Sequence, residues 1–187
     1  CTGYSPCQNR PAARDLLDAL RQLGIRSESS NGFPPIKIYG GTFNGGSAKL
    51  KGSVSSQYLS SLLMCAPYAN KGATISVIGN LASKPYIDIT LDVMKNFGVA
   101  VKNINYKKFV IKSNKKYKAK SYKVEGDASS ASYFFAAAAI TKGRVMVKNI
   151  NSNTKQGDIK FVELLKGMGC GIKKGNDFIK VEGRSLK

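Results

Sequence analysis

The sequence predicts an α/β (α+β) protein made of repeated βαβαββ units, of which this chain holds about two and a half. Short segments with alternating apolar residues are typical of strands, and segments with apolar residues at helical spacing are typical of amphipathic helices. Glycines end the helical segments, and the whole pattern returns at a nearly fixed period. Gly24 and Gly98 lie 74 residues apart, and so do Gly52 and Gly126. A period of this kind indicates units that cover one another's apolar faces.

The first part of the chain reads as the back half of one unit followed by the start of another. Asn9 and Pro11 suit the beginning of a leucine-rich helix that Gly24 ends. A turn at Asn31-Gly32 precedes an alternating strand, and a glycine-rich turn at 44–46 leads to a short strand that feeds a second helix. The expected elements are a helix at 11–23, strands at 35–39 and 48–51, and a helix that runs to residue 66.

Small polar residues precede this second helix, in the segment from Gly52 to Gln57. The first backbone N–H groups of a helix have no partner within it, and the helix dipole is positive at that end. Ser55, Ser56 and Gln57 add two hydroxyl groups and a carboxamide, a set of donors that suits an anion such as phosphate. Ordinary N-capping, the plainer interpretation, needs only one serine.

The rest of the chain completes one unit and repeats it. We expect a strand at 73–78, a helix that starts near Ser83 and stops at Gly98, and a strand pair at 99–101 and 109–111. Residues 122–130 then restate residues 48–56, which predicts a strand and a second serine-rich helix start. A helix at 158–168 and a strand at 178–181 follow. A chain that enters the repeat halfway through is expected to be a piece of something longer.

Composition excludes several classes of protein. The 187 residues are 42% hydrophobic, which indicates a folded chain, and no apolar stretch approaches the roughly 20 residues of a membrane span. The chain has no histidine, and its cysteines (Cys1, Cys7, Cys65 and Cys170) form no CxxC pair, so we expect no metal site. The scattered cysteines predict a cytoplasmic protein. No cofactor is expected.

The net charge of +19 attracts anions of every kind. Eighteen lysines follow residue 100, but they are spread over strands and turns, and few aromatic residues lie among them. A basic nucleic-acid-binding module therefore remains an alternative and not the preferred interpretation. It predicts binding that falls steeply with salt.

Three motifs, in order and at fitting spacing, resemble the 5-enolpyruvylshikimate-3-phosphate synthase family. They are Gly52-Ser53-Val54-Ser55-Ser56-Gln57-Tyr58-Leu59, Ser83-Lys84-Pro85-Tyr86-Ile87-Asp88-Ile89-Thr90 and Val124-Glu125-Gly126-Asp127-Ala128-Ser129-Ser130-Ala131-Ser132-Tyr133. The resemblance covers essentially the whole chain. It implies two domains, each of three βαβαββ units, with residues 1–124 in the first domain and 125–187 at the start of the second. It also implies a monomeric parent enzyme.

The family transfers the enolpyruvyl group of phosphoenolpyruvate to the 5-hydroxyl of shikimate 3-phosphate and releases phosphate. The resemblance implies that Ser55, Ser56, Gln57, Ser83 and Tyr86 bind shikimate 3-phosphate. It also implies that Arg10 and Gln57 contact phosphoenolpyruvate, since the fork of an arginine suits an oxyanion. Asp127 matches an acidic residue where the family's chain crosses between domains, and it is a possible catalytic group, although an aspartate there is also a good N-cap.

The sequence departs from the family in two respects. Gly3-Tyr4-Ser5-Pro6-Cys7 stands where the family usually has an aspartate and a methionine. The chain also holds no convincing acid–base pair for proton transfer, so we expect it to be inactive alone. The sister enzyme that uses UDP-N-acetylglucosamine is an alternative, in which Cys7 could take the part of its loop cysteine. The serine motifs favour shikimate 3-phosphate.

Overall fold

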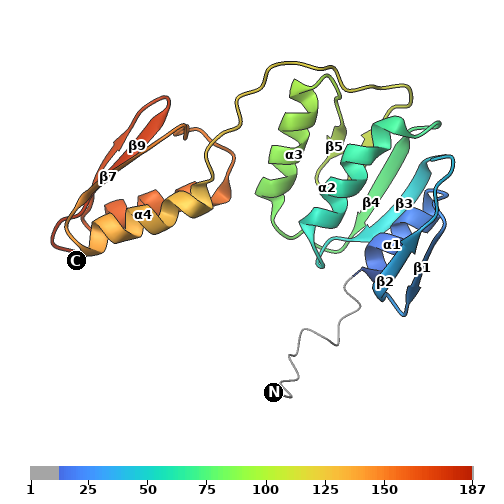
Figure 1. Cartoon of the computed structure of the whole chain (residues 1–187), viewed down its shortest axis with the longest axis horizontal. Coiled ribbons are helices and arrows are strands. Elements are labelled where there is room, and N and C mark those ends of the chain that lie inside the picture. Colours follow the sequence, from blue (N-terminus) through green and yellow to red (C-terminus); the bar gives the residue numbers. More distant parts are fainter. Residues whose placement is uncertain (1–12, 187) are drawn as a thin grey trace. The chain divides into compact units, whose positions relative to one another are not determined.

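The computed structural model describes residues 13–186. The chain forms two compact units, and the boundary between them along the sequence falls between Ala119 and Lys120. Each unit contains helices and a sheet (Figure 1). This mixture confirms the predicted α+β class. The assignment of the two units to two domains of a larger enzyme stays a prediction. No helix among the described residues is both long and apolar enough to cross a membrane.

The first unit is organised around a four-stranded sheet with two helices against it (Figure 1). Its strands, in spatial order, are β3 (Gly46–Lys51), β4 (Ala73–Ile78), β6 (Lys108–Ile111) and β5 (Lys102–Ile104). Its helices are α2 (Ser56–Cys65), which follows β3, and α3 (Lys84–Asn96), which follows β4. The β3–β4 pair is parallel and the other pairs are antiparallel.

Period-two alternation in the strands creates the core of this unit. Leu50, Ile75 and Phe109 are buried on one face of the sheet, while Lys49 and Lys108 on the other face are exposed. Leu59 and Ile87 of the two helices are fully buried in the same cluster. The helices and most of the strands of this unit were therefore predictable from their patterns, and the strand at 73–78 is confirmed residue for residue.

A helix and a hairpin precede this sheet: α1 (Arg14–Gln22), β1 (Ser27–Ser30) and β2 (Phe33–Ile38). The helix begins three residues later than predicted, after Ala13, which provides no side-chain cap; Asn9 and Pro11 lie outside the described residues. Gln22 covers the outer edge of β3. Its Oε1 accepts the Lys49 N–H at 2.8 Å and its Nε2 donates to the Lys49 carbonyl at 3.3 Å. This side chain satisfies backbone groups that an edge strand leaves free.

The second unit repeats the pattern with one element missing. Its elements are α4 (Ala128–Ile140), β7 (Arg144–Lys148), a 3₁₀ turn (Gly157–Lys160), α5 (Phe161–Gly167), β8 (Gly171–Lys174) and β9 (Phe178–Glu182). The three strands are antiparallel in the order β7-β9-β8. They match β4, β6 and β5 of the first unit.

Two strand predictions were wrong. Residues 122–125 form no strand: Val124 is 73% exposed, and its carbonyl accepts a hydrogen bond from the Asn149 side chain instead of joining a ladder. The strand expected at 99–101 begins only at Lys102, because Val99 is buried in the core directly after Gly98 ends the helix. In addition, the single helix expected at 158–168 is a 3₁₀ turn followed by α5.

Candidate functional site

The parallel pair β3–β4 brings two helix starts to one edge of the sheet. The chain leaves the carboxyl ends of both strands there and enters α2 and α3. Gly52 joins the two connecting loops, because its N–H donates to the Ile78 carbonyl at 3.0 Å and its carbonyl accepts the Ala82 N–H at 2.9 Å. The serine motifs at residues 55–57 and 83–86 are therefore neighbours in space. Their separation in the sequence does not show this.

The start of α2 leaves polar groups available. Ser55 is the N-cap, and its Oγ accepts the Gln57 N–H at 3.1 Å. Ser56 is only 8% exposed, yet its hydroxyl forms no hydrogen bond within residues 13–186. The exposed carboxamide of Gln57 has no partner in that range either. Among these residues the buried side-chain oxygen without a partner is Ser27 Oγ, so Ser56 Oγ is within reach of solvent, and both the Ser56 hydroxyl and the Gln57 carboxamide are available to a ligand.

The start of α3 is strained and also uncapped by its own side chain. Ser83 has φ 54° and ψ 52°, the left-handed region, and its hydroxyl makes no capping hydrogen bond. This conformation costs a residue other than glycine about 1–2 kcal/mol, and such strain gathers at functional sites. Tyr86, in the same turn, is 52% exposed. Its phenol has no hydrogen-bond partner among the described residues, so two hydroxyl groups face outward from this turn without a structural task.

A hydrogen bond between side chains links the two helices one turn below these groups. Thr90 Oγ1 donates to the Tyr86 carbonyl at 2.8 Å and lies 2.8 Å from Ser60 Oγ of α2. This contact holds α2 and α3 together near their first turns. Arg10, the predicted phosphoenolpyruvate contact, lies outside the described residues.

Asp127 stands at the start of α4, in the second unit, as its N-cap. Its carboxylate accepts the Ser129 N–H at 3.0 Å, the Ser130 N–H at 3.3 Å and the Ser130 hydroxyl at 2.6 Å. The Ser130 hydroxyl and then the Ser129 amide hold the pKa of Asp127 below its usual value. The group is therefore ionised at neutral pH. It can accept a proton or a hydrogen bond, but it has no proton to donate.

A second cap closes the same helix start. Gln156 Oε1 accepts the Ala128 N–H at 2.7 Å, and its Nε2 donates to the Gly126 carbonyl at 2.7 Å and to Glu125 at 3.2 Å. Glu125 also accepts the hydroxyl hydrogen of Thr154 at 2.7 Å. Sequence reasoning missed Gln156 and Glu125. Only a comparison of the two repeat units could have indicated them, because no described side chain of the first unit caps the corresponding helix start in this way.

The repeat therefore contains two related helix starts with opposite properties. At α4 the first three amides, those of Ala128, Ser129 and Ser130, all have side-chain acceptors from the protein, and a carboxylate already occupies the positive end. At α2, as far as residues 13–186 show, only the amide of Gln57 has a side-chain acceptor, which is a neutral hydroxyl. An anion would meet free donors at α2 and a negative charge at α4. The α2–α3 edge is thus the candidate anion site.

Comparison with known proteins shows the family of the chain. The model of the family "EPSP synthase (3-phosphoshikimate 1-carboxyvinyltransferase)" matches residues 1–187. A 3-phosphoshikimate 1-carboxyvinyltransferase of Citrobacter koseri is 50% identical over 181 residues, which are 95% of this chain and 42% of that protein. One of Actinobacillus pleuropneumoniae is 49% identical over 189 residues, with 100% of this chain and 43% of that protein covered.

The solved structures give the same fold. An EPSP synthase structure from Acinetobacter baumannii matches all of this chain and 43% of its own, with a TM-score of 0.73 at 24% identity. This chain spans a little over two fifths of the length of the curated relatives that it matches. The family model, the curated relatives and the shared fold agree, and the chain belongs to the EPSP synthase family.

Proposed function

We propose that the protein containing this chain transfers the enolpyruvyl group of phosphoenolpyruvate to the 5-hydroxyl of shikimate 3-phosphate and releases phosphate. The activity belongs to the whole protein, and these 187 residues contribute part of its substrate site. The proposal extends to a monomeric enzyme of the cytoplasm that needs no cofactor and acts in the biosynthesis of aromatic amino acids.

One observation carries the proposal: the convergence of unpartnered donors at the carboxyl edge of β3 and β4. Ser56, Gln57, Ser83 and Tyr86 have polar side-chain groups without hydrogen bonds among residues 13–186, although neighbouring helices hold them in place. A phosphate monoester next to a hydroxylated ring needs such a set, since its anion binds the amides and hydroxyl groups at a helix start.

The proposed roles divide between the two substrates. Ser55 and Ser56 bind the phosphate group of shikimate 3-phosphate at the start of α2. Ser83 and Tyr86 bind the same substrate from the start of α3. Gln57 lies between the two substrates, and Arg10 contacts phosphoenolpyruvate. Asp127, ionised and held as a cap, is assigned no proton-donating role.

Calorimetric titration of the full-length protein with shikimate 3-phosphate tests this assignment. Hydrogen bonds to a charged group contribute about 1.5–3 kcal/mol each, so the Ser55→Ala/Ser56→Ala/Gln57→Ala variant should lose at least ~100-fold in affinity. Ser61→Ala is the matched control: Ser61 lies in the same helix, and among the described residues its hydroxyl bonds only the Tyr58 carbonyl, at 2.9 Å. Control and wild type should bind alike. A folded wild type that does not bind, or a triple variant that binds as tightly, contradicts the proposal.

A further inference from the structure

Two strained residues of the first unit lie at the candidate site. Among its described residues with positive φ, apart from glycine, three are asparagines, which tolerate this conformation, and the other two are Ser83 and Tyr106. Tyr106 has φ 56° in the turn between β5 and β6, where a bulky side chain is a clear outlier. Ser83 and Tyr106 come from different elements, 23 residues apart in the sequence.

The turn that carries Tyr106 belongs to the same edge of the sheet. Strand β6 runs antiparallel to β4, so the turn before β6 lies at the carboxyl end of β4. The Val77 N–H donates to the Lys107 carbonyl at 2.8 Å, and Lys107 Nζ donates to the Gly79 carbonyl at 2.7 Å. These bonds fasten the turn to the segment that leads into Ser83.

Tyr106 then reaches the first turns of α3. Its hydroxyl donates to Asp88 Oδ1 at 2.8 Å, and Lys84 Nζ lies 5.1 Å from the centre of its ring. Lys84 and Asp88 are one helical turn apart, and Lys84 directly follows Ser83. The half-buried ring also packs against the core. Tyr106 is therefore a strut between the sheet and the start of α3, which has no side-chain cap of its own.

We propose that the hydrogen bond from Tyr106 to Asp88 is a positioning contact, which holds the start of α3 so that Ser83 and Tyr86 present their hydroxyl groups to shikimate 3-phosphate. The inference rests on the proposed function and deepens it. Neither Tyr106 nor Asp88 needs to touch the substrate. Their contact compensates for the missing cap, and the left-handed Ser83 keeps its hydroxyl free for the ligand.

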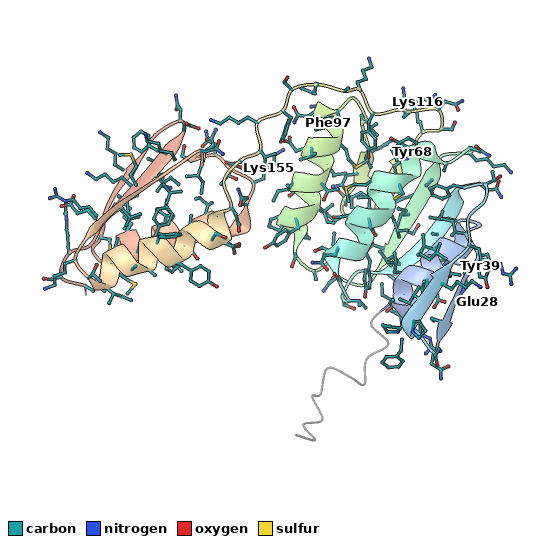
Figure 2. All side chains as sticks on the ribbon, in the orientation of Figure 1. Glu28, Tyr39, Tyr68, Phe97, Lys116 and Lys155 are labelled. Atoms are coloured by element: carbon teal, nitrogen blue, oxygen red, sulfur yellow. The ribbon has the colours of Figure 1, made fainter. Side chains whose placement is uncertain are left out.

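The chain offers a matched control on the β1–β2 hairpin. Tyr39 donates to Glu28 Oε2 at 2.6 Å, and Arg26 and Lys37 lie against its ring, so it repeats the chemistry of a phenol bound to a carboxylate with a cation over the ring. Figure 2 shows Tyr39 and Glu28 side by side on this hairpin. The hairpin is separate from the loops that Gly52 joins. Tyr39→Phe removes the same kind of bond from a place without a ligand role.

The test compares Tyr106→Phe and Tyr39→Phe in the full-length protein, by titration with shikimate 3-phosphate and by steady-state kinetics. Loss of one hydrogen bond to a carboxylate should weaken shikimate 3-phosphate binding about five- to tenfold in Tyr106→Phe. Its KM for shikimate 3-phosphate should rise by the same factor while kcat changes less than about twofold. Tyr39→Phe should match the wild type in both, although each variant loses one hydrogen bond.

A second pair of variants, at Asp88, tests the same contact if the Tyr106→Phe protein fails to fold. Asp88→Asn retains an oxygen that accepts the phenol hydrogen, and it should bind within about twofold of wild type, whereas Asp88→Ala should lose as much as Tyr106→Phe. Wild-type binding by Tyr106→Phe or Asp88→Ala, or equal weakening by Tyr39→Phe, overturns the positioning contact alone. A wild-type protein that does not bind shikimate 3-phosphate overturns the proposed function itself.

Discussion

Replacing Gly52 by alanine tests whether the two loops at the candidate site depend on close contact. A Cβ atom there would lie 2.6 Å from Val77 Cγ1 and 2.8 Å from the Asn80 carbonyl oxygen. Non-bonded carbon atoms prefer about 3.5–4.0 Å, so the loops must separate by roughly 1 Å. Val77 is buried and the second contact is backbone, so neither atom can turn aside easily. Overpacking of this kind costs about 1–3 kcal/mol.

The separation should also reach the ligand. Both backbone groups of Gly52 bond to the segment from Ile78 to Ala82, which leads into Ser83. We expect Gly52→Ala to lower the urea unfolding midpoint of the full-length protein and to weaken shikimate 3-phosphate binding more than tenfold. Gly40→Ala is the control, because no atom of the described part of the chain lies within 4 Å of its Cβ position. If the two variants unfold and bind alike, the close approach of the loops has no energetic consequence and the reasoning is refuted.

Three further predictions concern stability and pH. In α4, Phe135 is 1% exposed and its neighbour Phe134 is 61% exposed, so Phe135→Ala should destabilise by about 3–5 kcal/mol and Phe134→Ala by less than about 1 kcal/mol, as measured by urea unfolding; equal losses would refute the packing. Burial raises the pKa of Tyr117 to about 12. Its neutral form therefore stabilises the fold up to the ordinary tyrosine pKa, and this contribution is lost as pH rises from there towards about 12. Tyr117→Phe should show a shallower loss of thermal stability over that interval, and a slope equal to that of the wild type would contradict this expectation. The pKa of Asp127 is lowered by its bonds to Ser130 and Ser129, so its contribution is present above the unfolded-state pKa and lost as pH falls below it; Asp127→Asn should flatten the acid side of the stability curve, and a curve that does not change would count against the cap.

Local patterns were sufficient for most of the fold. The alternation at 73–78 and the helical spacing of residues 87–97 define β4 and α3, because these residues face one core. The prediction of a strand at 122–125 was wrong, because this segment resembles β3 in sequence but does not have the neighbouring contacts that β3 has. In the first unit Gln22 satisfies the outer edge of β3. In the second unit the carbonyl of Val124 bonds the Asn149 side chain.

The polar helix start was predictable from the sequence, and the arrangement of the residues around it was not. Ser55, Ser56 and Gln57 were expected at a helix start, and the structure places them there. No local rule shows that Ser83 adopts a left-handed conformation without capping its helix, or that Tyr106 supports the same turn. Both facts depend on contacts between segments that are distant in the sequence, and only the assembled sheet brings these segments together.

The most direct test of the central claim is the release of inorganic phosphate from phosphoenolpyruvate by the full-length protein, followed with and without shikimate 3-phosphate. The account predicts release only when both are present, together with one enolpyruvyl group added to shikimate 3-phosphate in the mass spectrum of the product. UDP-N-acetylglucosamine in place of shikimate 3-phosphate should give no release. Release with UDP-N-acetylglucosamine, or no release with shikimate 3-phosphate from a folded protein, would contradict the account.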